Sequence, residues 1–145
     1  MYRFKLEALL KHRRHQEEAC QKELAQARRK LADEQEELGR KKRKKRENIQ
    51  KLQIKQKESA GVSGIILYIS YIQQLSKDIQ DQTGCVQEAA KKVDQKRNEL
   101  ILTVKRRKTL EKLKDKEWQN YRQKMMQDER KLIDEIASTR YAGTM

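Results

Sequence analysis

The chain has 145 residues, enough for one ordinary domain, but only 35% of them are hydrophobic and 40% are charged. A compact globular core needs about 45–50% apolar residues, so this composition argues against an ordinary globular fold. Pro is absent, and the abundance of Lys, Glu, Gln, Arg, Leu and Ala favours long uninterrupted helices. The formal net charge of +14 is compatible with an anionic partner, which could be nucleic acid, an acidic lipid surface or an acidic protein.

A first helix is expected from about residue 2 to residue 58. Five of its leucines fall on one seven-residue series, which is typical of a coiled-coil seam: Leu10, Leu24, Leu31, Leu38 and Leu52. The seam becomes polar at seven consecutive cations, Arg40–Arg46, called the basic run below. This run could contact nucleic-acid phosphates or an anionic membrane surface, or it could simply be solvated.

The one clear break lies at residues 59–64, where Gly61 and Gly64 interrupt the helical pattern and Ser63 is a candidate N-cap. A second helix is expected from about residue 65 to residue 140. Its first heptad series is apolar throughout: Ile65, Ile72, Ile79, Val86, Val93 and Leu100. One break between two such segments predicts a single coiled-coil domain over residues 1–145 with an all-α fold, a long antiparallel two-helix coiled-coil hairpin.

The pairing of the two helices follows from a bend centred near Val62. Apolar residues then face one another at four levels, namely Leu24 with Leu100, Leu31 with Val93, Leu38 with Val86, and Leu52 with Ile72. Tyr2 reaches the level of Arg122, so the second helix continues as a C-terminal overhang. Met and Ile side chains on this overhang indicate a docking surface for another protein, with a frayed tail as the alternative: Met125, Met126, Leu132, Ile133 and Ile136.

The sequence carries no recognisable catalytic chemistry. It has no Gly-rich phosphate loop and no Ser nucleophile with a plausible base, so we expect no enzymatic activity, no catalytic residues and no cofactor. His12 and His15 lie three residues apart near Glu18, but no further strong ligand is fixed nearby, and no metal site is expected. Two isolated cysteines and the lack of a bilayer-spanning apolar stretch predict a cytoplasmic location.

Three stretches resemble the flagellar export protein FliJ family, in matching order and over essentially the whole chain. They are Phe4-x-Leu6-Glu7-x-Leu9-Leu10-x-x-Arg13-x-x-x-Glu17, Tyr68-x-x-Tyr71-x-x-x-Leu75 and Glu129-x-Lys131-x-x-Asp134-Glu135-x-Ala137. The resemblance implies a component of the bacterial flagellar type III protein export apparatus, similar to the coiled-coil stalk formed by the gamma subunit of rotary ATPases.

The resemblance also implies partners and contact residues. In the family, the end that bears both termini enters the ring of the hexameric export ATPase, another part contacts the cytosolic domain of the membrane export gate, and members assist export chaperones. The expected ATPase contacts are Phe4, Leu6, Arg13, Arg14, Lys131, Asp134 and Glu135. The expected gate contacts are Tyr68, Tyr71 and Leu75, of which Tyr71 alone is expected to be exposed. The implied location is peripheral to the inner membrane at the flagellar base.

Two other functions remain alternatives to an export stalk. One is a basic coiled coil that binds nucleic acid, although no aromatic residues for base stacking are interleaved with the basic run. The other is the equivalent stalk of a virulence type III secretion system. Salt dependence separates the first of these from the export role, because binding to phosphates releases counterions and weakens steeply with salt.

Overall fold

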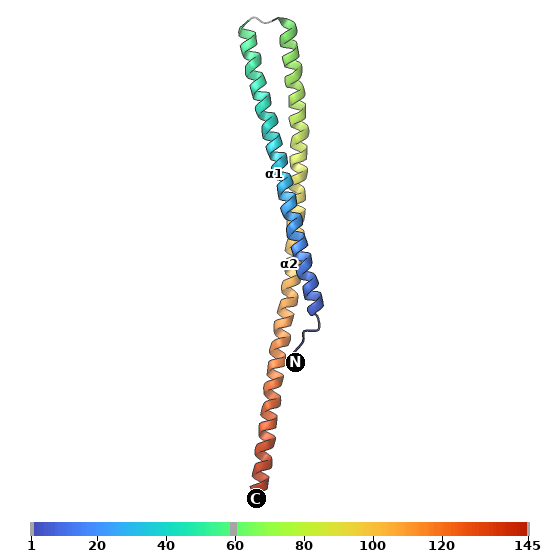
Figure 1. Cartoon of the computed structure of the whole chain (residues 1–145), viewed down its shortest axis with the longest axis vertical. Helices are drawn as coiled ribbons and strands as arrows, with labels where there is room; N and C mark the ends of the chain where they lie inside the picture. Colours follow the sequence, from blue (N-terminus) through green and yellow to red (C-terminus); the bar gives the residue numbers. More distant parts are fainter. Residues whose placement is uncertain (1, 59–60, 145) are drawn as a thin grey trace. The chain divides into compact units, whose positions relative to one another are not determined.

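The structure, a computed structural model, describes residues 2–58 and 61–144. Within these ranges the chain forms two helices and no strand: α1 spans Glu7–Lys57 and α2 spans Val62–Thr144 (Figure 1). The predicted all-α fold of two long antiparallel helices is confirmed. The chain divides into two compact units, which are described separately here. Unit 1 combines Met1–Glu18 with Ile101–Met145, and unit 2 comprises Ala19–Leu100.

Unit 2 is a helical hairpin held by an apolar seam. Leu24, Ala27 and Val93 are buried in one cluster, and the partly buried Leu31 and Leu100 pack against it. This cluster agrees with the predicted pairing of Leu24 with Leu100 and of Leu31 with Val93. Heptad spacing therefore brings the predicted apolar residues together at this level of the hairpin.

A polar pair interrupts the same seam. Gln82 is buried, and its amide Nε2 donates a hydrogen bond to the backbone carbonyl of Glu34 over 3.0 Å and another to the Glu34 carboxylate. Its carbonyl oxygen accepts a hydrogen bond from Lys41 Nζ over 3.4 Å. Because a buried amide is costly unless it is hydrogen-bonded, this arrangement favours the one register in which Gln82 meets Glu34 and Lys41.

The break between the helices is shorter than the sequence predicted. Residues 59 and 60 of the predicted turn lie outside the described residues. α2 begins at Val62 rather than near residue 65, so Ser63 and Gly64 already lie inside the helix, and the prediction of Ser63 as N-cap is wrong. The carbonyl of Gly61 accepts hydrogen bonds from Gly64 N (3.0 Å) and Ile65 N (3.3 Å), so Gly61 takes the N-cap position, which tolerates Gly well.

Unit 1 begins with five described residues that are not helical, whereas a helix was expected from about residue 2. α1 starts at Glu7, whose amide donates to the carbonyl of Phe4 over 3.2 Å. The Phe4 side chain is only 6% exposed, and Leu10 in the first helical turns is completely buried. We attribute the later start to the burial of Phe4, together with the favourable acidic residue in the first turn of α1.

The C-terminal part of α2 extends beyond the N-terminal residues of unit 1. From residue 122 to residue 143 every side chain is exposed, and Figure 1 shows this red end of α2 with no part of α1 beside it. The predicted overhang is therefore present. Residues 122–143 are called the terminal segment below.

Candidate functional site

Three aromatic rings close the end of unit 1 that precedes the terminal segment. The Tyr2 ring lies 5.0 Å from the Trp118 ring at an edge-on angle of 61°, and 5.2 Å from the Tyr121 ring. Trp118 and Tyr121 stack with their centroids 5.9 Å apart. Desolvation in this cluster, followed by the nearby Glu117 charge, raises the pKa of Tyr2, so its hydroxyl stays protonated at neutral pH. The cluster fastens the N-terminal residues onto α2.

Charged side chains connect the two segments of unit 1 at an earlier point along α2, before the ring cluster. Arg107 contacts the carboxylate of Glu17 and donates to Glu111 over 2.9 Å, while Arg14 approaches Glu111 to 3.7 Å. These bonds, first to Glu111 and then to Glu17, raise the pKa of Arg107. The sequence did not predict this network, because a highly charged sequence does not distinguish charged residues that pair beside the seam from those that are solvated.

A second ion pair lies near the start of α1. Lys114 Nζ is 2.9 Å from the Glu7 carboxylate, and this hydrogen bond lowers the pKa of Glu7. The hydroxyl of Tyr2 also donates to the backbone carbonyl of Lys114 over 3.4 Å. Lys114 thus holds both the first helical turn and the residues that precede it.

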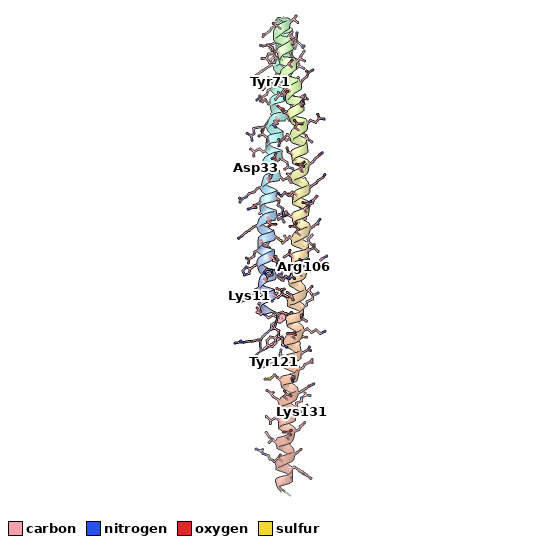
Figure 2. All side chains as sticks on the ribbon, turned by 90° about the vertical axis from the view of Figure 1, so that its right-hand side faces the viewer. Lys11, Asp33, Tyr71, Arg106, Tyr121 and Lys131 are labelled. Carbon is pink, nitrogen blue, oxygen red and sulfur yellow. The ribbon has the colours of Figure 1, made fainter. Side chains whose placement is uncertain are left out.

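The terminal segment is amphipathic and exposes its apolar face. At 3.6 residues per turn, the large apolar side chains share one broad face: Met125, Met126, Leu132, Ile133 and Ile136. The predicted contacts Lys131, Asp134 and Glu135 lie on the opposite face by the same spacing. Figure 2 shows Tyr121 near the N-terminal residues and Lys131 beyond them. The segment carries five basic and four acidic residues, so its charge is nearly balanced.

The predicted N-terminal contacts occupy different environments. Phe4 is buried and supports unit 1 from inside, whereas Leu6 lies at the surface. Arg13 donates to the Gln16 side chain over 3.1 Å, and Arg14 is exposed beside Glu111. Leu6, Arg13 and Arg14 therefore remain candidates for direct contact with a partner, while Phe4 can act only through the residues that it positions.

The predicted gate contacts lie in unit 2, near the start of α2. Leu75 is buried in the seam, and Tyr68 is half-buried with Lys55 Nζ 4.6 Å from its ring centroid. Tyr71 is 40% exposed, which confirms the expectation that it alone faces solvent (Figure 2). Lys44 Nζ lies 5.8 Å from the Tyr71 ring, and hydrogen bonding to Tyr71 raises the pKa of Lys44. Lys44 consequently remains a cation at neutral pH.

The end of the unit 2 hairpin has an unusual composition, and we call residues 40–58 and 61–77 the hairpin tip. Between Arg40 and Lys77 the sequence has eleven basic residues and two acidic ones, yet the first fifteen residues of α2, 62–76, have no charge at all. Several large aliphatic side chains of the hairpin tip are exposed, namely Ile54 on α1 and Val62, Ile66, Leu67 and Ile69 on α2. Sequence reasoning missed this surface, although an uncharged stretch in a chain with 40% charged residues was the available signal.

The described ranges contain neither a candidate metal site nor a candidate membrane-spanning helix. No cluster of three or more His, Cys, Asp or Glu residues in residues 2–58 and 61–144 could hold a metal ion. Neither helix, over its described part, contains a segment that is both apolar enough and long enough to traverse a bilayer. The candidate sites are therefore surfaces, namely the terminal segment with the N-terminal residues in unit 1, and the hairpin tip in unit 2.

Two long antiparallel helices that pack against each other place the chain in the all-α class of helical hairpins. The family model for the flagellar FliJ protein matches residues 2–145, and the chain belongs to the FliJ family. Its structure is similar to that of the YscO homolog CT670 from Chlamydia trachomatis, with a TM-score of 0.69 and 20% sequence identity over 95% of this chain and 94% of the other. Comparison with curated proteins finds no match.

Membership of this family defines the general role of the chain. FliJ proteins are stalk or adaptor proteins, and they are cytoplasmic components of the flagellar type III export apparatus. The partners of this chain accordingly belong to that apparatus.

Proposed function

We propose that this chain is a stalk of the export ATPase, and that unit 1 inserts its termini into the central opening of the hexameric ring. The observation that carries the proposal is the terminal segment, a stretch of helix exposed on every side with large apolar side chains on one face. An isolated helix of this length is marginally stable in water, so a partner that covers the apolar face would stabilise it.

Both faces of the terminal segment have a place in this mechanism. A helix inside a ring is surrounded by protein, so the apolar face around Leu132 and Ile136 supplies buried area. The opposite face carries Lys131, Asp134 and Glu135, which can pair with charges on the ATPase subunits. Such pairs contribute orientation and specificity more than affinity.

The N-terminal residues support the same contact. Leu6 and Arg14 lie at the surface of unit 1, and Arg13 is half-buried close by. The aromatic cluster and the buried Phe4 hold these residues beside α2. In this proposal, Leu6, Arg13 and Arg14 touch the ring, and Phe4 positions them.

A second contact is proposed for unit 2. The exposed ring of Tyr71 is suited to bind the cytosolic domain of the export gate, while Tyr68 and Leu75 shape the surface from the seam side. This contact would hold the protein at the inner membrane beneath the flagellar base. Assistance to export chaperones is part of the same proposal through the family relationship.

Stimulation of the cognate ATPase tests the main contact. Deleting residues 124–145 should abolish stimulation, and the double change Leu132→Gln with Ile136→Gln should raise the concentration needed for half-stimulation by about tenfold. The matched control is Ile101→Gln with Leu102→Gln, which alters two exposed aliphatic residues elsewhere on α2. If the deletion left stimulation intact, the ring contact would have to be assigned to other residues.

A further inference from the structure

The hairpin tip combines many cations with exposed aliphatic side chains. Its α1 side carries the basic run together with Lys51, Lys55 and Lys57. The start of α2 is uncharged over residues 62–76, and Asp78, just beyond this stretch, lies near Lys44. The terminal segment, by comparison, mixes five basic with four acidic residues around its apolar face. A partner of the hairpin tip must therefore be anionic and must also accept aliphatic side chains.

The exposed aliphatic residues of α2 lie outside the seam. Val62, Ile66 and Ile69 follow one another at spacings of four and three, so they share one helix face, and Leu67 borders it. Ile66 is 56% exposed and Leu67 is 70% exposed. The seam-side residues Tyr68, Ile72 and Leu75 are less exposed or buried, so the aliphatic face points away from α1.

We propose that the hairpin tip binds the surface of an anionic lipid bilayer, with the aliphatic face of α2 in the interface and the cations of α1 on the lipid phosphates. An amphipathic helix in this position buries its apolar face about 5–10 Å deep, at the boundary between headgroups and acyl chains. Packed helices lie about 8–10 Å apart. The second helix of the tip then lies at the level of the headgroups, where its lysines and arginines meet phosphate.

The distribution of the cations indicates how the tip lies. From Arg40 to Lys57 the basic residues extend over about 26 Å of helix at 1.5 Å per residue. This length is about three times the Debye length at physiological salt, so a hairpin standing upright on its turn would leave the basic run screened from the surface. The tip must therefore lie along the membrane for these charges to contribute.

The aliphatic side chains favour a bilayer over nucleic acid. A phosphate polymer needs the cations and gains nothing from exposed Ile66 and Leu67. A bilayer needs both, because electrostatic attraction brings the helix to the surface and apolar burial retains it there. Loss of the aliphatic side chains should therefore weaken binding to a bilayer but leave binding to nucleic acid unchanged.

Flotation of the full-length protein with lipid vesicles tests the proposal. Vesicles of phosphatidylcholine mixed with phosphatidylglycerol should carry the protein, and vesicles of phosphatidylcholine alone should not. Replacing Ile66→Gln and Leu67→Gln should weaken partitioning into the anionic vesicles by about tenfold. The control is the pair Ile101→Gln and Leu102→Gln, also adjacent and exposed on α2, which should leave partitioning unchanged.

A second set of variants tests the charges. The triple change Lys42→Gln, Arg43→Gln and Arg46→Gln should weaken partitioning by at least about tenfold, because each cation near an anionic surface contributes roughly fivefold. The matched control, Arg28→Gln, Arg29→Gln and Lys30→Gln, removes three exposed cations from another part of α1 and should have little effect. Circular dichroism checks that every variant retains its helix content.

Two results would overturn the proposal. Equal flotation with both kinds of vesicle would show that binding does not require anionic lipid. Loss of binding in the cation triple with no change in the Ile66 and Leu67 variant would show that binding depends on charge alone, which would remove the role of the aliphatic face. The vesicles contain neither ATPase nor export gate, so failure here leaves the proposed stalk function untouched.

Discussion

Unit 1 and unit 2 are built from the same two helices but are held together by different interactions. Unit 2 has an apolar cluster around Leu24 and Val93, with one buried polar pair at Gln82. Unit 1 relies on the buried Phe4 and Leu10, on three aromatic rings, and on ion pairs of Arg107 and Lys114. Where heptad leucines are scarce, rings and paired charges thus take over the role of the seam.

The units also differ in what they leave exposed. In unit 1 the exposed apolar face of the terminal segment lies among balanced charges, which suits a protein partner with charges of both signs. In unit 2 the exposed aliphatic side chains of the hairpin tip accompany an excess of nine positive charges between Arg40 and Lys77, eleven basic less two acidic residues. Two exposed apolar surfaces on one chain therefore fit two different kinds of partner.

The largest effect is expected where unit 1 depends on one leucine. Leu10 is 0% exposed, so Leu10→Ala should reduce the free energy of unfolding by about 3 kcal/mol through lost burial and a residual cavity. Its neighbour Leu9 is 37% exposed, and Leu9→Ala serves as the matched control with a much smaller loss. Urea denaturation gives the total, and hydrogen exchange should show faster opening in residues 7–18. Equal losses for both variants would contradict this account of unit 1.

A smaller effect is expected at the polar pair of unit 2. Gln82→Ala removes the buried amide and its hydrogen bonds to Glu34, which should lower the free energy of unfolding by about 1 kcal/mol. Gln80→Ala changes the same residue type at an exposed position two residues earlier and should be close to neutral. Thermal or urea denaturation of the two variants, compared side by side, measures the difference. A neutral Gln82→Ala would mean that the seam of unit 2 holds without its polar layer.

The smallest effect concerns the acid dependence of unit 1. The hydrogen bond from Lys114 lowers the pKa of Glu7 below its ordinary value of 4.5. The pair therefore contributes stability above that value, and the contribution is lost as the pH falls through the lower pKa of the folded state. Glu7→Gln should flatten the dependence of the melting temperature on pH in this acidic range and lower it slightly at neutral pH. An unchanged acid dependence would show that the ion pair is immaterial to unit 1.

Much of the fold could be predicted because a coiled coil is specified by the period of its apolar residues. The heptad series of Ile65 to Leu100 indicated the second helix, and the glycines near Gly61 located the bend. The start of α2 at Val62 and the later start of α1 at Glu7 were missed. Helix ends depend on individual hydrogen bonds and on the packing of single side chains such as Phe4, which periodicity does not encode.

The surfaces were predicted less completely. The exposed terminal segment could be predicted from the position of the bend, because a bend near Val62 leaves the second helix longer than the first. The ring cluster of Tyr2, Trp118 and Tyr121 did not follow, since it depends on a non-helical N-terminal stretch folding against α2. The hairpin tip was predicted only in part. The basic run is plain in the sequence, whereas exposure of the aliphatic residues at 62–69 depends on how α2 packs against α1.

The ring cluster has a practical consequence. Trp118 is the single tryptophan of the sequence, and it lies against Tyr2 at the point where the terminal segment begins. The tryptophan fluorescence of the unlabelled protein therefore arises at the junction between the N-terminal residues packed on α2 and the exposed helix. The emission of Trp118 should change when the N-terminal residues detach from α2 or when a partner covers the adjoining terminal segment. Binding of a partner at this end can therefore be followed without a label.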